Sequence, residues 1–85
     1  MSKYELTVVL DGKATAAKKK KVTETIEKIV SLLKGKLGKV EDWGVKEAGL
    51  YLFFPLETPK SSVKMISTKL SQENDVNKYL LIRKD

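Results

Sequence analysis

The side chains able to do chemistry in this 85-residue sequence are carboxylates, lysines, hydroxyls and one arginine, Arg83, because histidine and cysteine are absent. Their absence removes the common transition-metal ligands, the acid–base group that titrates near neutral pH and the thiol nucleophile. Two acidic pairs remain, Glu41-Asp42 and Glu73 with Asp75. Metal or glycosidase chemistry needs two carboxylates that face each other across a pocket. Neighbouring strand residues point to opposite faces, so Glu41 and Asp42 cannot act together. Glu73 and Asp75 fit a helix end and a turn. We therefore expect no active site and no metal.

Positive charge is the main chemical feature of the chain, whose formal net charge is +6. This balance favours a polyanionic partner such as nucleic acid or an anionic membrane. The most conspicuous run is Lys-Lys-Lys-Lys at residues 18–21. One interpretation is contact with RNA phosphates. A solvated helix face is the favoured alternative, because four consecutive residues fan around a helix by more than a full turn and form no compact patch.

The elements that position these groups follow from apolar spacing, and the hydrophobic content of 41% is typical of a folded domain. Alternation predicts strands over residues 4–10, 37–45, 50–57 and 76–83. Helical spacing predicts helices over residues 15–34 and 58–71. The first has Thr15 as its N-cap and Gly35 at its C-terminal stop, and the second begins with a Thr58 cap followed by proline.

The resulting order is β-α-β-β-α-β over one domain, residues 1–85. It predicts an α+β, ferredoxin-like sandwich, with a four-stranded antiparallel sheet and both helices on one face. In that topology the first and third predicted strands are central, and the second and fourth are edges. The fold alone names no function.

Residues 39–44, Lys-Val-Glu-Asp-Trp-Gly, resemble a motif of the bacterial small-subunit ribosomal protein S6 family. Three further stretches agree: Tyr-Glu-Leu-Thr-Val-Val-Leu at 4–10, Gly-Leu-Tyr-Leu-Phe-Phe at 49–54, and Asn-Asp-Val-Asn-Lys-Tyr-Leu-Leu-Ile-Arg-Lys at 74–84. The resemblance covers nearly the whole chain in order. It departs at the central hairpin, where the family's Leu-Ala-Tyr-Pro-Ile segment is missing, so the hairpin between strands two and three is shortened.

The resemblance implies a non-catalytic, structural role in the small ribosomal subunit. Family members bind small-subunit ribosomal RNA on the platform, paired with ribosomal protein S18, and need no cofactor or small-molecule substrate. We therefore expect a cytoplasmic protein on the ribosome, with no membrane partner. In agreement, no segment approaches the roughly 18 apolar residues of a membrane span, and the opening residues do not form a signal peptide.

The candidate RNA contacts on this resemblance lie at strand ends: Lys3, Tyr4, Lys78, Arg83 and Lys84. The first and last strands should be antiparallel neighbours, which brings four of them to one end of the sheet. Cations beside an aromatic ring suit phosphate contact combined with base stacking, and arginine alone makes a planar bidentate phosphate contact. Lys78, at the other end, is the weaker candidate. Ordinary strand-end charge, with Tyr4 in the core, is the alternative.

The candidate partner contacts form an aromatic patch on the open face of the sheet: Trp43, Tyr51 and Phe53, with Lys46 at its rim. An exposed aromatic patch marks a protein partner or a base-stacking platform. On the resemblance we assign it to S18. Simple cross-strand packing is the alternative.

Three other functions fit the same fold. An RNA-recognition-motif module would need a basic-glycine-aromatic signature on its third strand, which residues 50–56 lack. A regulatory ligand-binding domain would usually dimerise edge to edge, and the basic charge counts against it. A small phosphatase would need an arginine in the loop after the first strand, where this chain has Lys13.

Overall fold

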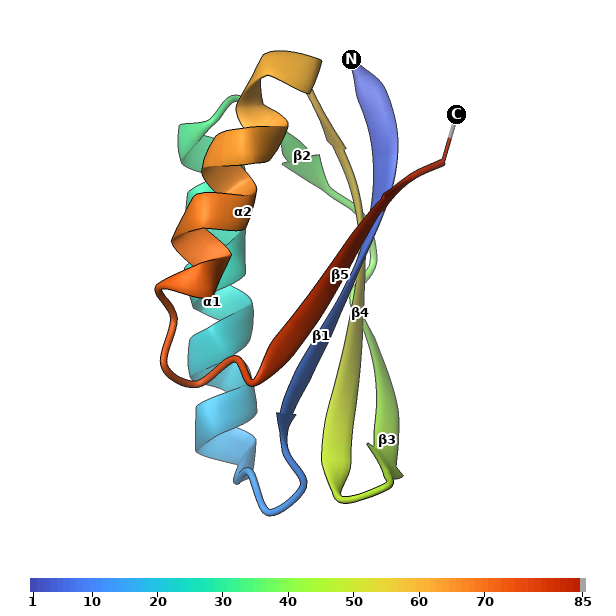
Figure 1. Cartoon of the computed structure of the whole chain (residues 1–85), viewed down its shortest axis with the longest axis vertical. Coiled ribbons are helices and arrows are strands. Elements are labelled where there is room, and N and C mark those ends of the chain that lie inside the picture. The colour runs from blue at the N-terminus through green and yellow to red at the C-terminus, as the bar shows by residue number, and fades with distance from the viewer. Residues whose placement is uncertain (85) are drawn as a thin grey trace.

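The computed structural model describes residues 1–84 as two layers, a β-sheet and a pair of helices that cover one of its faces (Figure 1). In chain order the elements are β1 (Ser2–Asp11), α1 (Ala16–Leu32), β2 (Lys36–Leu37), β3 (Glu41–Lys46), β4 (Gly49–Thr58), the 3-10 turn η1 (Lys60–Ser62), α2 (Val63–Ser71) and β5 (Lys78–Arg83). This arrangement confirms the ferredoxin-like prediction. No helix within residues 1–84 has the length and apolar character needed to cross a bilayer.

The sheet is antiparallel, with β1 and β4 at its centre. β1 pairs with β4 along its whole length, from Ser2 opposite Thr58 to Asp11 opposite Gly49. β5 forms one edge beside β1, while β2 and β3 both pair with β4 on the other side. The predicted central strands are therefore confirmed. The start of β1 and the end of β5 lie at the same end of the sheet, where Tyr4 pairs with Arg83 (Figure 1).

The core lies between the sheet and the helices, and strand alternation builds it. Every second residue of β1, from Tyr4 to Leu10, is buried, as is every second residue of β4 from Leu50 to Leu56. The helices contribute six more buried side chains: Val22, Ile26, Ile29, Val30, Ile66 and Leu70. Since these side chains all point to one side, the opposite face of the sheet is left uncovered.

Pro55 explains why the second predicted strand, residues 37–45, is found as two short pieces. The Pro55 carbonyl accepts a hydrogen bond from the Gly38 amide at 2.7 Å. In a strand the amide and carbonyl of one residue point to the same side, so the missing N–H of proline also faces this edge. The edge ladder stops there, and it resumes at β3 opposite Phe53.

The end of α1 differs by one residue from the prediction that Gly35 is the left-handed stop. Leu33 is the C-cap, and the left-handed conformation falls on Lys34, with φ of 62°. The amides of Lys34 and Gly35 donate to Ser31 at 3.1 Å and to Val30 at 2.8 Å, which is the Schellman pattern. Gly35 is needed for close approach instead, since a Cβ there would lie 2.8 Å from the Glu57 carbonyl oxygen.

The start of the second helix corrects another expectation. Thr58 does not cap α2: it is the last residue of β4 and fully buried, and among residues 1–84 its hydroxyl has no hydrogen-bond partner. Pro59 precedes the 3-10 turn η1, and α2 begins only at Val63. The last strand also begins later than predicted, at Lys78 rather than at residue 76. The predicted Thr15 cap is confirmed, because its hydroxyl accepts from the Lys18 amide at 3.1 Å.

Candidate nucleic-acid and protein interface

The Asp-Trp-Gly segment is a β-bulge that turns one aromatic side chain outward. The register of β3 against β4 shifts between Asp42 and Gly44, so Trp43 is the extra residue. The Asp42 carboxylate accepts a hydrogen bond from the Gly44 amide at 2.8 Å. Gly44 has φ of 80°, a left-handed conformation that glycine adopts without strain. Each residue of the segment therefore has a structural role: Asp42 accepts the hydrogen bond, Trp43 is the bulged residue and Gly44 adopts the left-handed conformation.

Trp43 packs across the sheet on Phe53. The two rings are stacked, with centroids 4.8 Å apart and 11° between their planes. The indole Nε1 donates to a Glu41 carboxylate oxygen at 2.9 Å, which holds the ring in this orientation. Trp43 nevertheless keeps 43% of its surface exposed. The predicted patch is thus partly cross-strand packing and partly open to a partner.

The open face carries a wider apolar surface than the sequence suggested. Thr7 pairs with Phe53 on one side and with Leu80 on the other, so these three form a row across the sheet. The next row joins Pro55, Glu5 and Ile82 in the same way. We call these two rows together with Trp43 and Tyr51 the apolar sheet face.

Leu80 and Ile82 are the residues that sequence reasoning left out of the patch. They are 58% and 48% exposed, which makes them prominent parts of the apolar sheet face. The alternation of residues along β5 already predicted that Leu80 and Ile82 lie on the other face of the sheet from Tyr79 and Leu81. Only the register of β5 on β1 shows that they continue the row of Phe53.

Lys46 lies at the hairpin end of this face. It pairs with Gly49, two residues before Tyr51, and it is exposed, which agrees with its predicted place at the rim. The hairpin closes through two residues, Glu47 and Ala48, which both have positive φ, 50° and 65°. This is the tight type I′ geometry. The shortened hairpin is therefore a complete turn with an intact ladder up to its tip.

The predicted strand-end cluster does assemble, but on two faces. The Lys84 amide donates to the Lys3 carbonyl at 2.8 Å, and the two side chains share the open face. Arg83 pairs with Tyr4 and faces the helix side. Lys78 lies opposite Val9, far along the strand from the others. The three cations expected at this end of the sheet, Lys3, Arg83 and Lys84, therefore do lie there, and Lys78 lies at the other end as expected.

Tyr4 is a correction to the candidate RNA contacts. Its side chain is only 7% exposed and belongs to the hydrophobic core. Its ring therefore cannot serve as a base-stacking surface, because the helix side of the sheet covers it. The alternative interpretation of a core tyrosine is the correct one.

Lys36 is a cation that sequence reasoning missed at the same end of the sheet. It pairs with Glu57, which in turn pairs with Lys3, so the outermost row of the open face carries several charges. The Lys84 ammonium also contacts the Glu5 carboxylate at 3.3 Å. A shallow hollow runs between Lys36, Lys3 and Lys84 over Pro55. Lys36 lies at this end of the sheet because β2 pairs with the end of β4, which the sequence did not predict.

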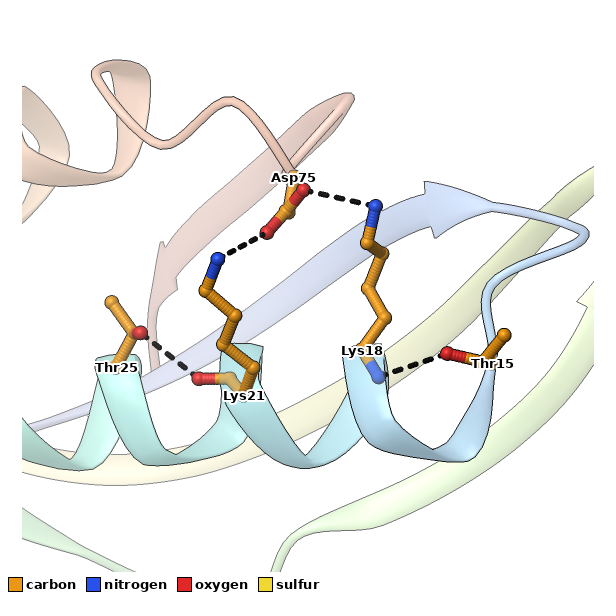
Figure 2. A network of polar contacts seen from close by, with 5 residues as sticks. All are labelled: Thr15, Lys18, Lys21, Thr25 and Asp75. Atoms are coloured by element: carbon orange, nitrogen blue, oxygen red, sulfur yellow. Dashed lines mark hydrogen bonds and ion pairs between the residues drawn. The ribbon is translucent and has the colours of Figure 1, made fainter.

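The lysine run at residues 18–21 is mostly engaged in ion pairs within the protein. Lys18 and Lys21 both reach Asp75, at 3.2 Å and 3.6 Å, as Figure 2 shows. Lys19 reaches Asp42 at 3.1 Å. The run therefore ties the start of α1 to the loop before β5 and to β3. It is neither a simple solvated face nor a free phosphate site.

These contacts change the ionisation of both acidic partners. The backbone amide of Gly44 and then the Lys19 ammonium hold the pKa of Asp42 below its ordinary value. The hydrogen bond from Lys18 is the main cause of the lowered pKa of Asp75. With Glu41 held by the Trp43 indole, three of the four predicted acidic-pair carboxylates have structural partners.

The profile of the family described as Ribosomal protein S6 matches residues 3–83. The chain belongs to the ribosomal protein S6 family. The family is structural and non-catalytic and belongs to the small ribosomal subunit in the cytoplasm. This membership decides against a phosphatase or a regulatory ligand-binding domain. It also accounts for the agreement of four separate sequence stretches with the family pattern.

One similar curated protein is small ribosomal subunit protein bS6 of Dehalococcoides mccartyi. It is 28% identical over 91 residues, which span 96% of this chain and 84% of that protein.

Solved structures show the same fold. The crystal structure of 30S ribosomal protein S6 from Thermotoga maritima matches with a TM-score of 0.87 and 18% identity, covering 98% of this chain and 87% of that one. The C-terminal domain of MgtC from Mycobacterium tuberculosis matches with a TM-score of 0.78 and 13% identity, covering 99% and 88%. The MgtC domain therefore shares the ferredoxin-like fold of this S6-family chain, although it is not named as a ribosomal protein. The fold by itself does not indicate a function.

Proposed function

We propose that this chain binds small-subunit ribosomal RNA jointly with ribosomal protein S18, as a non-catalytic scaffold. The observation that carries the proposal is the uncovered apolar sheet face. Trp43, Leu80 and Ile82 each expose more than two fifths of their surface there. A contiguous exposed apolar surface on a small soluble domain marks a protein contact. Aromatic side chains in such a patch supply much of the binding free energy.

S18 is the partner we assign to the apolar sheet face. The stacked pair of Trp43 and Phe53 is already ordered by its own packing and by the Glu41 hydrogen bond. Because the two rings are already ordered, this chain loses little side-chain entropy when a partner covers them. Lys46 and Lys78 lie at the hairpin end of the same face, where they form the polar rim that interfaces usually have.

RNA contact is assigned to the cations at the opposite end of the sheet. Lys3 and Lys84 are adjacent on the open face, and Lys36 lies across the same outermost row. Arg83 joins them from the helix side and supplies the planar guanidinium. Each lysine or arginine that neutralises a phosphate releases counterions and adds to a salt-dependent affinity. Glu5 pairs with the Lys84 ammonium at 3.3 Å, and Glu5 and Glu57 together limit the total charge of this region.

The test is binding to a platform fragment of small-subunit ribosomal RNA over a salt series, with and without S18. We expect tight binding only when S18 is present, with an affinity that falls steeply with salt. Lys3→Gln with Lys84→Gln should reduce the slope of log affinity against log salt by about 0.7–0.9 for each phosphate that these lysines neutralise in the wild-type chain.

A matched pair of leucine variants tests the protein contact. Leu80→Ser lies on the apolar sheet face, whereas Leu32→Ser changes a leucine of the helix layer that is 74% exposed. We expect Leu80→Ser to weaken S18 binding about tenfold or more, which corresponds to about 1.4 kcal/mol, and Leu32→Ser to leave it unchanged. Equal binding by both variants would assign S18 to another surface. No RNA binding by the folded wild-type chain, with or without S18, would remove the proposed function.

A further inference from the structure

The positive charge of this chain is concentrated in the helix layer and its connections. Residues 12–40 and 59–77 hold twelve lysines against four acidic residues. The strands and the hairpin, residues 2–11, 41–58 and 78–84, hold five basic against six acidic residues. The sheet, which carries the interface described above, is therefore close to neutral. The helix-bearing segments account for the basic character of the protein, and of their twelve lysines the interface assigned above uses only Lys36.

Part of this charge is neutralised within the protein and part is not. Three lysines of the run at residues 18–21 pair with Asp42 or Asp75. Four other lysines on the two helices form no ion pair with any residue that the structure describes: Lys20, Lys28, Lys64 and Lys69. These four are exposed, apart from Lys69, which is half-buried. Their charge is available to an external anion.

A groove between α1 and α2 lies among these lysines. Lys28 and Lys69 border it from the two helices, and the buried Ile29 and the exposed Leu32 also line it. Its uncharged polar groups are Gln72 and Thr25. Glu73 also lines it, which leaves an excess of one positive charge in the groove itself.

The exposed side of α1 continues the groove, because Thr25 and Lys28 line both. This side adds Lys20 and Lys21, with Glu24 between them and Lys28. We call the groove and this side of α1 together the helix groove. Lys20 and Lys28 are eight residues apart on α1, which is roughly 12 Å along the helix axis.

We propose that the helix groove is a second contact surface for the sugar–phosphate backbone of RNA. This inference rests on the proposed function, because it assigns a further surface to the same RNA partner. Lysines spaced along a helix suit a chain of phosphates, because each lysine can neutralise a separate phosphate.

The chemistry of the groove favours RNA over an anionic membrane. The Gln72 amide can donate to a phosphate oxygen. The Thr25 hydroxyl already donates to the Lys21 carbonyl at 2.9 Å, and it can still accept from a ribose 2′-hydroxyl. Membrane-surface helices instead expose a broad apolar face that enters the acyl region. Here the helix layer exposes only two large apolar side chains among residues 1–84, Leu32 and Met65. RNA is therefore the partner to which the inference commits.

The consequence is a chain with contacts on opposite faces. Figure 1 shows both helices on one side of the sheet. The helix groove, which α1 and α2 line, therefore lies on the other side of the sandwich from the apolar sheet face. A protein partner on the sheet would leave the groove accessible to RNA. The chain would then bridge S18 and an RNA segment that does not pass the strand-end cluster.

Two double variants with the same loss of charge test the inference. Lys28→Gln with Lys69→Gln removes two lysines of the helix groove. Lys13→Gln with Lys39→Gln removes two exposed lysines outside it, so each variant falls from a formal net charge of +6 to +4. Thermal unfolding of both establishes that they fold. With S18 and the platform RNA fragment, we expect the first variant to lower the salt slope by about 1.5 and the second to leave it unchanged.

Lysine acetylation with mass-spectrometric readout locates the contact directly. In the complex of wild-type chain, S18 and RNA, we expect Lys28 and Lys69 to be protected relative to the complex without RNA. Protection of Lys3 and Lys84 alone would overturn the inference while the proposed function stands. An equal fall in salt slope for both double variants would also overturn it, since the groove would then act only through net charge.

Two further outcomes separate the remaining explanations. If the wild-type chain shows neither RNA binding nor protection of any lysine, the proposed function itself fails. If vesicles of phosphatidylcholine and phosphatidylserine protect Lys28 and Lys69 and the RNA fragment does not, the groove is a membrane contact and the inference is overturned. Protection by RNA, with no protection by vesicles, is the expected result.

Discussion

The indole of Trp43 lies nearly parallel to the phenyl ring of Phe53, with 4.8 Å between the ring centroids and 11° between the ring planes. The two residues come from neighbouring strands, and the stack exists because the bulge before Gly44 lifts Trp43 out of the β3 ladder. Asp42 fixes the bulge by accepting from the Gly44 amide. A three-residue sequence thus forms one unit that presents an aromatic surface.

Removal of either ring should cost stability as well as partner binding. Stacked aromatic pairs contribute about 0.5–1.5 kcal/mol beyond the area they bury. We expect Trp43→Ala and Phe53→Ala each to destabilise the chain, with a coupling free energy of about 1 kcal/mol in a double-mutant cycle measured by urea unfolding. Additive effects of the two substitutions would show that the stack contributes nothing of its own. Glu41→Gln, which keeps an acceptor for the indole, is the control.

Substitutions at the hairpin tip should stabilise the chain. Glu47 and Ala48 adopt a left-handed conformation, which carries a strain of about 1–2 kcal/mol per residue. Asn-Gly is the preferred pair for this turn. We expect Glu47→Asn with Ala48→Gly to raise the free energy of unfolding by about 1–2 kcal/mol. The hydrogen bond from the Gly12 amide to the Ala48 carbonyl is retained, since it is a backbone contact. A loss of stability would show that the turn is not under strain.

The fold and several residues of the candidate interface could be predicted from the sequence, because strand alternation and helical spacing are local signals. Tyr4, Leu6, Val8 and Leu10 had to share one face because side chains alternate along a strand. The break at Pro55 and the place of Lys36 depend on which strands are neighbours, which spacing alone does not determine. Leu80 joined the apolar sheet face only through the register of β5 on β1. The lysine run was ambiguous for the same reason, since Asp42 and Asp75 are distant in sequence.

The end of α1 gives a second stability test, in which two adjacent residues should respond in opposite ways. Lys34 has φ of 62°, so Lys34→Gly should stabilise the chain by about 1 kcal/mol. Gly35→Ala would place a Cβ 2.8 Å from the Glu57 carbonyl oxygen and 2.8 Å from a Val30 methyl group. We expect it to cost about 1–3 kcal/mol, as overpacking typically does. Equal effects in urea unfolding would contradict this assignment of roles.

Thr58 offers a stabilising substitution inside the fold. Its side chain is fully buried, and within residues 1–84 its hydroxyl has no partner. A buried polar group without a hydrogen bond costs about 1–3 kcal/mol. We expect Thr58→Val to raise the free energy of unfolding by about 1 kcal/mol. Thr7→Val, at a half-buried strand position on the open face, is the control and should change stability by less than about 0.5 kcal/mol.

The ion pairs at the start of α1 predict how stability responds to acid. Hydrogen bonds and lysine charges lower the pKa of Asp42 and of Asp75 in the folded chain below the ordinary value of 3.8. The folded state therefore binds protons less readily at these groups than the unfolded state does. The stability that these two carboxylates contribute is complete at pH values above their ordinary pKa. It is lost as the pH falls through their folded-state pKa values.

Asp75→Asn should therefore lower stability at pH 7 and flatten the loss of stability below about pH 4. Asp75 is the stronger test, because two lysines, Lys18 and Lys21, share its carboxylate (Figure 2). Urea unfolding between pH 7 and pH 2.5 measures both effects, with Glu27→Gln as an exposed control. High salt should reduce the difference between wild type and Asp75→Asn at pH 7, since exposed ion pairs are screened. A variant with the same acid slope as the wild type would show that the contacts at Asp75 do not stabilise the fold.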